Sequence, residues 1–251
     1  MLRLTAEQII NWSGAEVLAG DRLLNDRLIN KISSDSRTTG AGDLFIALRG
    51  DRFDGHAFLE QAIAQNAAAL LIDDRQAWQK LQSMDELTAK SKPARQILVL
   101  LTTDTQRALQ DIAAGYRMQL TGTVIAVTGS VGKTSTRQMI ASCLRPFLRV
   151  HETAGNLNNE IGLPQTLLGA AEDDDAVILE MGMRGPGEIA LLSRIARPDI
   201  AIITCIGWSH IGRLGSREAI QAAKWEIVSG IRPGGLLILN ADDPLLTGAT
   251  H

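Results

Sequence analysis

The sequence predicts an α/β protein in which a mostly parallel sheet is covered by helices on both faces. From residue 123 onward, apolar segments of strand length alternate with segments whose apolar residues recur at helical spacing. Such alternation is typical of βαβ units. A glycine-containing loop, TGSVGKTS, joins the first of these strands to the first helix. The segments before residue 121 are shorter and more mixed. We therefore expect a smaller α/β domain over residues 1–120 and a second domain over residues 121–251.

Composition and charge are those of an ordinary globular protein. The chain has 251 residues, of which 45% are hydrophobic and 21% charged, and a net charge of −3. No basic cluster is dense enough for a nucleic-acid surface, and no apolar run reaches the roughly 20 residues that span a membrane. The start of the chain lacks the apolar core and cleavage site of a signal peptide. Because Cys143 and Cys205 lie in apolar segments, we expect two reduced core thiols and a cytoplasmic protein.

In the amino-terminal part, Thr5 and Gln8 have the spacing of a capping box, which predicts a helix through Val17. Asp104 or Thr105 is expected to cap a second helix that reaches residue 120. A helix is also predicted over residues 57–68, and β-structure over residues 31–37, 42–50, 69–73 and 96–102. The polar segment 75–95 is predicted to lie on the surface.

In the carboxyl-terminal part, we predict four strands, over residues 123–129, 175–182, 199–207 and 234–243. Helices are predicted between them, over residues 133–144, 187–196 and 216–231. In such sheets, ligands bind beyond the carboxyl ends of the strands. The polar residues that follow each strand are therefore candidates for a site.

The loop after the first of these strands is the strongest candidate for binding phosphate. In the ordinary pattern, G-x-x-x-x-G-K-[ST], counting back from Gly132 places the first glycine at Val127, but here it comes later, at Gly129. Backbone N–H groups and the helix dipole favour an anion at this point. Lys133 adds a positive charge, and the Thr134 hydroxyl can ligate Mg²⁺. The alternative is a glycine-containing turn with a chance lysine.

Three further polar residues fall at the same edge of the predicted sheet. Glu180 ends the second strand, His210 follows the third, and Lys224 lies on the next helix. Each has a simpler explanation by itself: a capping carboxylate, a hydrogen-bonded loop histidine and a solvated helix lysine. A carboxylate and an imidazole beside a phosphate loop are more suggestive together, because oxygen ligands suit Mg²⁺, although an imidazole is a less usual ligand for it.

The loop resembles the shortened loop T-G-[ST]-x-G-K-[TS] of the Mur ligases and folylpolyglutamate synthetases. Residues 34–37 (SDSR) and 42–58 (GDLFIALRGDRFDGHAF) are similar to the UDP-binding domain of the ligases that extend the muramoyl peptide. Residues 153–164 (TAGNLNNEIGLP), 179–190 (LEMGMRGPGEIA) and 209–220 (SHIGRLGSREAI) resemble family members that add D-alanyl-D-alanine. Members that add the third peptide residue usually carry a Thr-Thr pair in the first of these segments, and none occurs here.

The resemblance implies an ATP-dependent, ADP-forming ligase of peptidoglycan synthesis. Such an enzyme joins D-alanyl-D-alanine to UDP-N-acetylmuramoyl-tripeptide through an acyl phosphate, with Mg²⁺ as cofactor. The implied protein is a cytoplasmic monomer with no nucleic-acid partner and no membrane span. Two alternatives stay open: another Mur ligase, such as the one that adds the third residue, and a non-catalytic module that binds a nucleotide or a UDP-sugar.

The resemblance also assigns roles to individual residues. Thr134 is implied to bind one Mg²⁺, and Glu180 and His210, which match the metal positions of the family, are implied to bind a second. Lys133 and Lys224, together with His210 and Glu180, match its catalytic positions. Lysine at the position of Lys224 is often carbamylated in the family. The residues implied to hold ATP are Thr128, Gly129, Ser130, Val131, Gly132, Lys133, Thr134 and Ser135. Those implied to contact a substrate or the phosphate are Asn158 and Asn159.

The segment from Ser34 to Arg37 is the implied UDP-substrate site. Ser34 and Ser36 offer hydroxyls, Asp35 offers a carboxylate and Arg37 offers a guanidinium suited to phosphate oxygens. Spacing alone favours the alternative of a surface turn with a structural Asp-Arg pair, and the family resemblance reverses this preference.

Two features depart from the family. A counterpart of its carboxyl-terminal domain, which helps bind ATP and the incoming amine, is absent from the 251 residues, and the ATP-binding domain is only partly present. Trp225 stands where the family usually has glycine. We therefore expect that these 251 residues are inactive by themselves.

Overall fold

The computed structural model describes residues 4–20, 28–50, 53–88 and 97–248. The chain divides into two compact units, Met1–Ile112 and Ala113–His251. The division between these units falls inside helix α4 (Thr105–Arg117). Asp104 caps this helix, because its carboxylate accepts a hydrogen bond from the Arg107 N–H at 3.0 Å.

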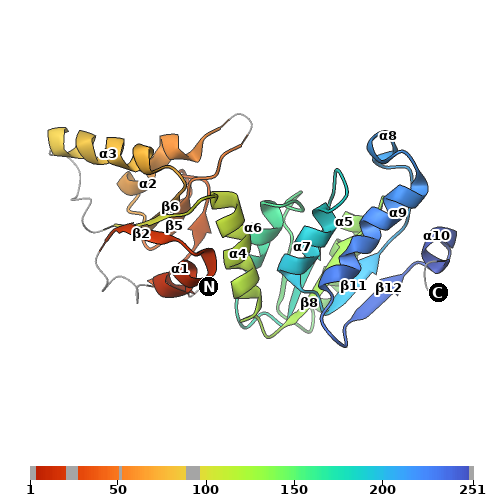
Figure 1. The fold of residues 1–251 in the computed structure, drawn as a ribbon. Coiled ribbons are helices and arrows are strands. Elements are labelled where there is room, and N and C mark those ends of the chain that lie inside the picture. The colour runs from red at the N-terminus through yellow and green to blue at the C-terminus, as the bar shows by residue number, and fades with distance from the viewer. Residues whose placement is uncertain (1–3, 21–27, 51–52, 89–96, 249–251) are drawn as a thin grey trace. The chain divides into compact units, whose positions relative to one another are not determined.

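The first unit is built on a five-stranded, mostly parallel sheet with the order β2-β7-β6-β5-β4. Figure 1 labels its strands β2, β5 and β6. Only the edge strand β2 runs antiparallel to its neighbour. A separate antiparallel pair joins β1 (Leu4–Thr5) to β3 (Leu28–Ile29). The strands of the main sheet are β2 (Glu16–Ala19), β4 (Ile32–Ser33), β5 (Leu44–Ile46), β6 (Ala69–Ile72) and β7 (Leu98–Leu101).

Helix α1 (Ala6–Ser13) begins at the predicted capping box, in which the Thr5 side chain accepts from the Gln8 N–H. The expected extension through Val17 is wrong. Gly14 adopts a left-handed conformation with φ +63°, which ends the helix and turns the chain into strand β2.

Two more helices pack in this unit. Helix α2 (Leu59–Ala64) follows a 3₁₀ turn, η2 (Gly55–Phe58), inside the predicted segment. Helix α3 (Arg75–Thr88) occupies most of the polar segment that was predicted only as surface. Its Trp78 is buried in the core formed with Phe45, Leu70 and Val99, so one face of this polar helix is anchored. The remainder of that segment, residues 89–95, lies outside the described residues.

The second unit is built on a five-stranded sheet with the order β12-β11-β8-β10-β9, and every pairing is parallel. The parallel α/β fold is therefore confirmed. The four predicted strands are β8 (Thr123–Thr128), β10 (Ala176–Glu180), β11 (Ile200–Ile203) and β12 (Leu236–Leu239). The prediction missed β9 (Val150–Glu152), whose three residues are too few to show a pattern.

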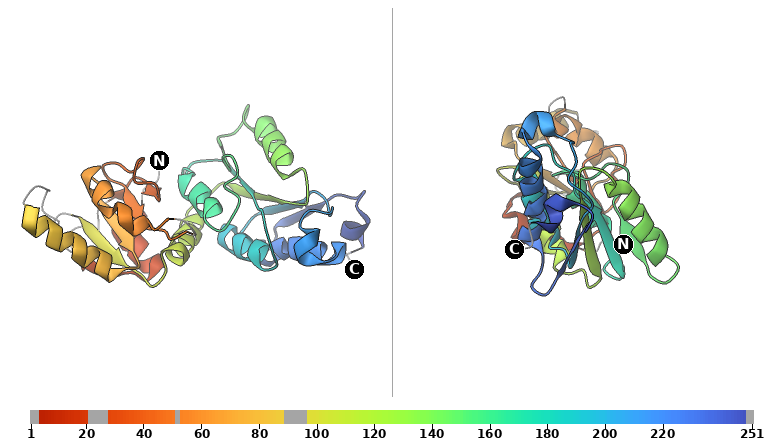
Figure 2. Two further views of the ribbon diagram at one scale, coloured as in Figure 1. Left: turned by 90° about the horizontal axis from the view of Figure 1, so that it is seen from above. Right: turned by 90° about the vertical axis from the view of Figure 1, so that its right-hand side faces the viewer.

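Helices cover both faces of this sheet. Helix α5 (Lys133–Leu144) lies on one face, and α7 (Glu188–Ala196) and α9 (Arg217–Trp225) lie on the other (Figure 2). The remaining helical segments are α6 (Gly162–Gly169), α8 (Ile211–Leu214), η4 (Glu226–Gly230) and α10 (Pro244–Thr247).

The two thiols are not both in the core, contrary to expectation. Cys143 is exposed on α5, and Cys205 is half-buried after β11. Apolar neighbours in the sequence are therefore a poor guide to the burial of a helical residue, because only one side of the helix packs against the sheet. Among the described residues, no helix is both long and apolar enough to cross a membrane.

Candidate functional site

The loop Gly129–Gly132 connects β8 to α5 at the carboxyl edge of the second unit's sheet. Gly129 has φ +148° and Gly132 has φ +84°, and Gly132 is the N-cap of α5. Both conformations favour glycine. Strand β8 lies in the middle of the sheet, between β10 and β11. From β8 the chain moves outward to β9 and returns through β10, then crosses to β11 on the other side, so the loop stands at the topological switch point.

The loop is fastened to the segment that follows β11. The Ser130 N–H donates to the Cys205 carbonyl at 2.9 Å, and the Thr204 hydroxyl donates to the Val131 carbonyl at 2.6 Å. A Cβ atom at Gly129 would lie 1.9 Å from Thr204 Oγ1. A side chain at position 129 would therefore collide with Thr204, which is a structural reason for the glycine at this later position.

We expect Gly129→Ala to destabilise the second unit. Strain from the positive φ of roughly 1–2 kcal/mol and overpacking against Thr204 of roughly 1–3 kcal/mol together predict a loss of about 2–5 kcal/mol. Gly234→Ala is the matched control, because Gly234 has φ +80° and a Cβ atom there would have no neighbouring atom within 4 Å. Urea unfolding of both variants checks this, and equal losses would contradict the proposed close approach.

The lysine of the loop is folded back onto it. Lys133 Nζ donates to the Gly129 carbonyl at 2.8 Å, so the ammonium already lies over the loop. Thr128 is fully buried, and its hydroxyl donates to the Met181 carbonyl at 2.9 Å. This side chain therefore supports the loop and is not exposed to a ligand. Ser135 is exposed at the first turn of α5. Ser130 is buried, and its hydroxyl makes no hydrogen bond among the described residues.

The predicted carboxylate reaches the loop. Glu180, at the end of β10, is 2% exposed, and its Oε2 accepts the Thr134 hydroxyl at 2.8 Å. Its Oε1 accepts the Asn158 side-chain amide at 2.9 Å. Asn158 itself is held because its carbonyl accepts the Gly182 N–H at 2.8 Å. Thr134, Glu180 and Asn158 are therefore one connected group.

The Asn159 side chain bonds to the backbone, whereas that of Asn158 bonds to Glu180. Its side-chain oxygen accepts the N–H groups of Ile161 and Gly162, at 3.3 and 2.8 Å, where α6 begins. This carboxamide caps a helix, which is a sufficient structural reason for the residue.

His210 and Lys224 share an electrostatic environment with Lys133. His210 has φ +67° at the start of α8, and its pKa is lowered by burial and by the charges of Lys224 and Lys133. Lys224 is 1% exposed, which contradicts the simpler explanation of a solvated helix lysine. Burial, with a further effect of Lys133, lowers its pKa to about 8.

The donors at this edge suit Mg²⁺ better than a softer metal. The Thr134 hydroxyl and the Glu180 carboxylate adjoin at 2.8 Å. Among the described residues, no three His, Cys, Asp or Glu side chains group as a complete metal site. Mg²⁺ commonly takes only one or two protein ligands and completes its shell with water and substrate phosphates. The residues therefore fit an ion that is held jointly with a nucleotide.

In the first unit, Asp35 and Arg37 form an exposed ion pair, with Arg37 Nη2 2.7 Å from Asp35 Oδ2. Hydrogen bonds from the Arg37 side chain and backbone lower the pKa of Asp35 to about 2. Ser36 is buried and donates to Gln61 Oε1 at 2.8 Å, so its hydroxyl is committed to α2. Ser34 is half-buried. Of these four side chains, Arg37 is the most exposed to a ligand.

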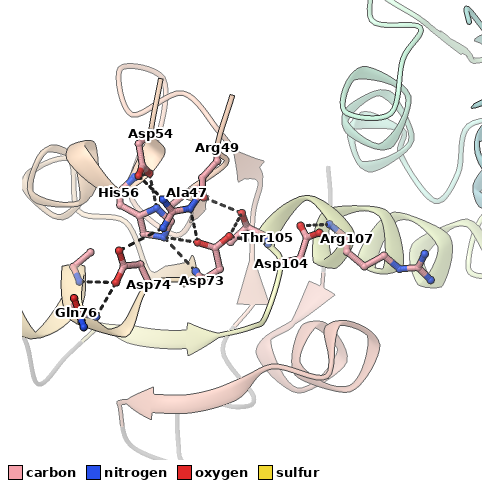
Figure 3. A network of polar contacts seen from close by, with 11 residues as sticks. Ala47, Arg49, Asp54, His56, Asp73, Asp74, Gln76, Asp104, Thr105 and Arg107 are labelled. Atoms are coloured by element: carbon pink, nitrogen blue, oxygen red, sulfur yellow. Dashed lines mark hydrogen bonds and ion pairs between the residues drawn. The ribbon is translucent and has the colours of Figure 1, made fainter. Parts of the chain in front are cut away.

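A larger polar network at the carboxyl edge of the same sheet was not predicted (Figure 3). Arg49 contacts three carboxylates, those of Asp54, Asp73 and Asp74, at 2.8, 3.0 and 3.4 Å. The ring of buried His56 lies 2.6 Å from Asp54 and accepts the Asp73 N–H at 3.2 Å. The signal available in the sequence was that charged residues directly follow two apolar strands.

Fold and loop together define the class, an α/β protein with a phosphate-loop pattern at the switch point of a parallel sheet. Two family models match the chain: "Mur ligase middle domain" over residues 127–250 and "Mur ligase family, catalytic domain" over residues 28–117. The chain belongs to the Mur ligase family, as the motifs indicated.

The chain is similar in sequence to curated ligases from several bacteria. The UDP-N-acetylmuramoyl-tripeptide–D-alanyl-D-alanine ligase of Synechocystis sp. is 45% identical over 92% of this chain and 48% of its own length. That of Bacillus subtilis is 46% identical over 88% of this chain and 46% of its own length. The chain thus spans about half the length of these relatives.

Solved structures agree with this assignment. MurF from Acinetobacter baumannii has a TM-score of 0.81 and 32% identity, covering 98% of this chain and 50% of that one. MurF from Thermotoga maritima in complex with ADP has a TM-score of 0.74 and 30% identity, covering 87% of this chain and 47% of that one.

Proposed function

We propose that this chain is the UDP-substrate- and ATP-binding part of a ligase that adds D-alanyl-D-alanine to UDP-N-acetylmuramoyl-tripeptide, a cytoplasmic step of peptidoglycan synthesis. A carboxylate oxygen of the tripeptide attacks the γ-phosphorus of ATP, and the bond to ADP breaks. The amine of D-alanyl-D-alanine then attacks the acyl carbon, loses a proton and expels phosphate. The protein is proposed to act as a monomer.

One observation carries this proposal: the Gly129–Gly132 loop, Lys133, Thr134 and Glu180 meet at one edge of the sheet in a chain 45% identical to such a ligase. Phosphoryl transfer depends mainly on positioning and charge neutralisation. In the proposed roles, the loop N–H groups and Lys133 hold the phosphates. Thr134, Glu180 and His210 would hold Mg²⁺, which when bound neutralises phosphate charge.

The first unit is proposed to hold the UDP end of the other substrate. Arg37 is the exposed guanidinium of the SDSR segment, and its partner Asp35 is also accessible. A diphosphate would compete with Asp35 for Arg37, because both offer oxygens to the same N–H fork. Asn158, whose amide already orients Glu180, is proposed to lie near the reacting phosphate.

Calorimetric titration of the 251-residue chain with ATP–Mg²⁺, and separately with UDP-N-acetylmuramoyl-tripeptide, tests both halves of the proposal. Binding of both is expected. In a complete ligase that contains these residues, D-alanyl-D-alanine should support ADP release and single amino acids should not. Turnover with a single amino acid would favour a ligase for another peptide position. Binding without turnover with any amine would favour a non-catalytic module.

We also expect no ligation by the 251 residues alone. The chain matches about half of each relative, and aligning reactants while excluding water depends on a closed active site. The measurement is chromatographic detection of UDP-N-acetylmuramoyl-pentapeptide after incubation with both substrates and ATP–Mg²⁺. Product formation by purified chain, free of host ligase, would overturn this expectation.

A further inference from the structure

A buried arginine stands behind the carboxylate of the candidate site. Arg137 lies one turn after Lys133 on α5 and is 4% exposed. Its Nη1 pairs with Glu152 on β9. Its Nε lies 3.6 Å from Glu180 Oε2 and makes no hydrogen bond among the described residues. The guanidinium is therefore held firmly by one glutamate and only approaches the other.

Glu152 has a second arginine of its own. Arg145, directly after the last residue of α5, pairs with Glu152 Oε1 and is half-exposed. The four side chains form a row, Glu180–Arg137–Glu152–Arg145, in which two positive charges balance two negative ones. Within the described residues, Arg137 is the only cation at ion-pair distance from Glu180, whereas Arg145 contacts Glu152 alone.

The unequal contacts matter for what Glu180 can bind. A carboxylate held by both N–H groups of an arginine fork has its oxygens occupied. Here the fork is drawn toward Glu152, and Glu180 Oε2 takes only the Thr134 hydroxyl as a close donor. The terminal torsion of a glutamate is broad, so a nearby fixed charge and the Asn158 amide together restrict it without filling Oε2.

We propose that Arg137 is a positioning residue for Mg²⁺: it holds the Glu180 carboxylate so that Oε2 and the Thr134 hydroxyl are offered to one ion, while Glu152 keeps Arg137 from closing on Glu180. This inference rests on the proposed function. Loss of a residue that orients a metal ligand typically weakens metal binding by about 10–100-fold.

Simple charge repulsion predicts the opposite change in Mg²⁺ affinity when Arg137 is replaced by a neutral residue. Removing a cation from the neighbourhood of a divalent cation should strengthen Mg²⁺ binding, since like charges repel. It should also weaken the binding of metal-free nucleotide. Positioning instead predicts weaker Mg²⁺ binding, with a smaller effect on nucleotide alone. The two effects can therefore be separated by direction and not merely by size.

The test compares Arg137→Gln, Arg137→Lys and the matched control Arg145→Gln in the 251-residue chain. Calorimetry measures ADP and ATP affinity with and without Mg²⁺, and thermal melts followed by circular dichroism report folding. For Arg137→Gln we expect at least a roughly tenfold loss of the Mg²⁺-dependent part of the affinity, with a smaller change without metal. Arg137→Lys should recover part of the loss, and Arg145→Gln should resemble the original chain.

Unchanged or tighter Mg²⁺ binding in folded Arg137→Gln overturns the inference, as does an equal loss in Arg145→Gln. If Arg137→Gln does not fold, Arg137→Lys decides: it keeps the charge but not the fork, so Mg²⁺ affinity equal to that of the original chain would overturn the inference. Failure of the original chain to bind ATP–Mg²⁺ at all would count against the proposed function instead.

Discussion

Lys133→Ala is expected to weaken ATP–Mg²⁺ binding by roughly 100-fold, which corresponds to about 2.7 kcal/mol. The ammonium lies 2.8 Å from the Gly129 carbonyl, over the loop that is proposed to hold the phosphates. A charge-assisted contact to phosphate is about twice as strong as a neutral hydrogen bond, and alanine removes it completely. Calorimetric titration of the 251-residue chain with ATP–Mg²⁺ measures the loss.

The matched control uses the other unit of the chain. Binding of UDP-N-acetylmuramoyl-tripeptide should change little in Lys133→Ala, and the variant should melt close to the original chain, because the lysine makes a single hydrogen bond to its own loop. Arg37→Ala should show the reverse pattern, with weaker binding of the UDP substrate and unchanged ATP binding. If Lys133→Ala loses both ligands equally, the variant has unfolded or the loop has been assigned wrongly.

Lys224→Met is expected to raise the free energy of unfolding at pH 7, by up to about 3 kcal/mol on the scale of 1.36 kcal/mol for each pKa unit. The lysine is 1% exposed, and burial lowers its pKa from 10.5 to about 8. At pH 7 the folded chain must therefore carry a charged amine in an environment that favours the neutral one. Methionine has a similar length and no charge.

The stability gained by Lys224→Met should depend on pH, because the pKa of the lysine differs between the folded and the unfolded chain. Between pH 8 and 10.5 the unfolded lysine still holds its proton while the folded one has released it, so the stability of the original chain rises with pH in that range. The advantage of Lys224→Met should be complete below about pH 8 and lost by about pH 10.5. Urea unfolding at pH 7, 9 and 10 measures it. A difference that does not vary with pH would show that the lysine is not titrating as described.

We further propose that this amine is carbamylated by CO₂. The reaction needs the neutral amine, which a lowered pKa makes available near neutrality, and the product replaces a repelled cation with oxygen ligands that suit Mg²⁺. Bicarbonate should then stabilise the original chain by mass action and leave Lys224→Met unaffected. A ¹³C carbamate resonance should appear with labelled bicarbonate only in the original chain, and its absence would reject the modification.

The periodic elements of the second unit were predictable because each has a strong local cause. Helix α5 begins and ends at the predicted residues, and the strands β8, β10, β11 and β12 all fall within the predicted segments. The central strands β8 and β10 are almost wholly buried, so their apolar runs are continuous and easily read, although β12 at the edge exposes Leu236 and Ile238. In the first unit the strands have only two to four residues, and a single left-handed glycine, Gly14, moved the end of α1.

The candidate residues could be named from the sequence, but their partners could not. Glu180 was expected beside the phosphate loop, and its carboxylate does accept the Thr134 hydroxyl. Arg137 and Thr204 had no signal of their own, since their importance comes from residues 43 and 75 positions away along the chain, as the contacts Arg137–Glu180 and Thr204–Gly129 show. Such pairs are set by strand order, which a linear pattern does not contain.

The sequence by itself determined the α/β alternation, the loop that departs from the common phosphate-binding pattern, and the family to which they point. These depend on spacing within a few residues, where backbone geometry and apolar periodicity act directly. Only the tertiary structure decided that Lys224 is buried, that Asn158 orients Glu180 while Asn159 caps α6, and that Arg137 stands between two glutamates. Burial and charge pairing arise when distant strands are brought side by side, and it is this packing that turns a set of polar residues into a site.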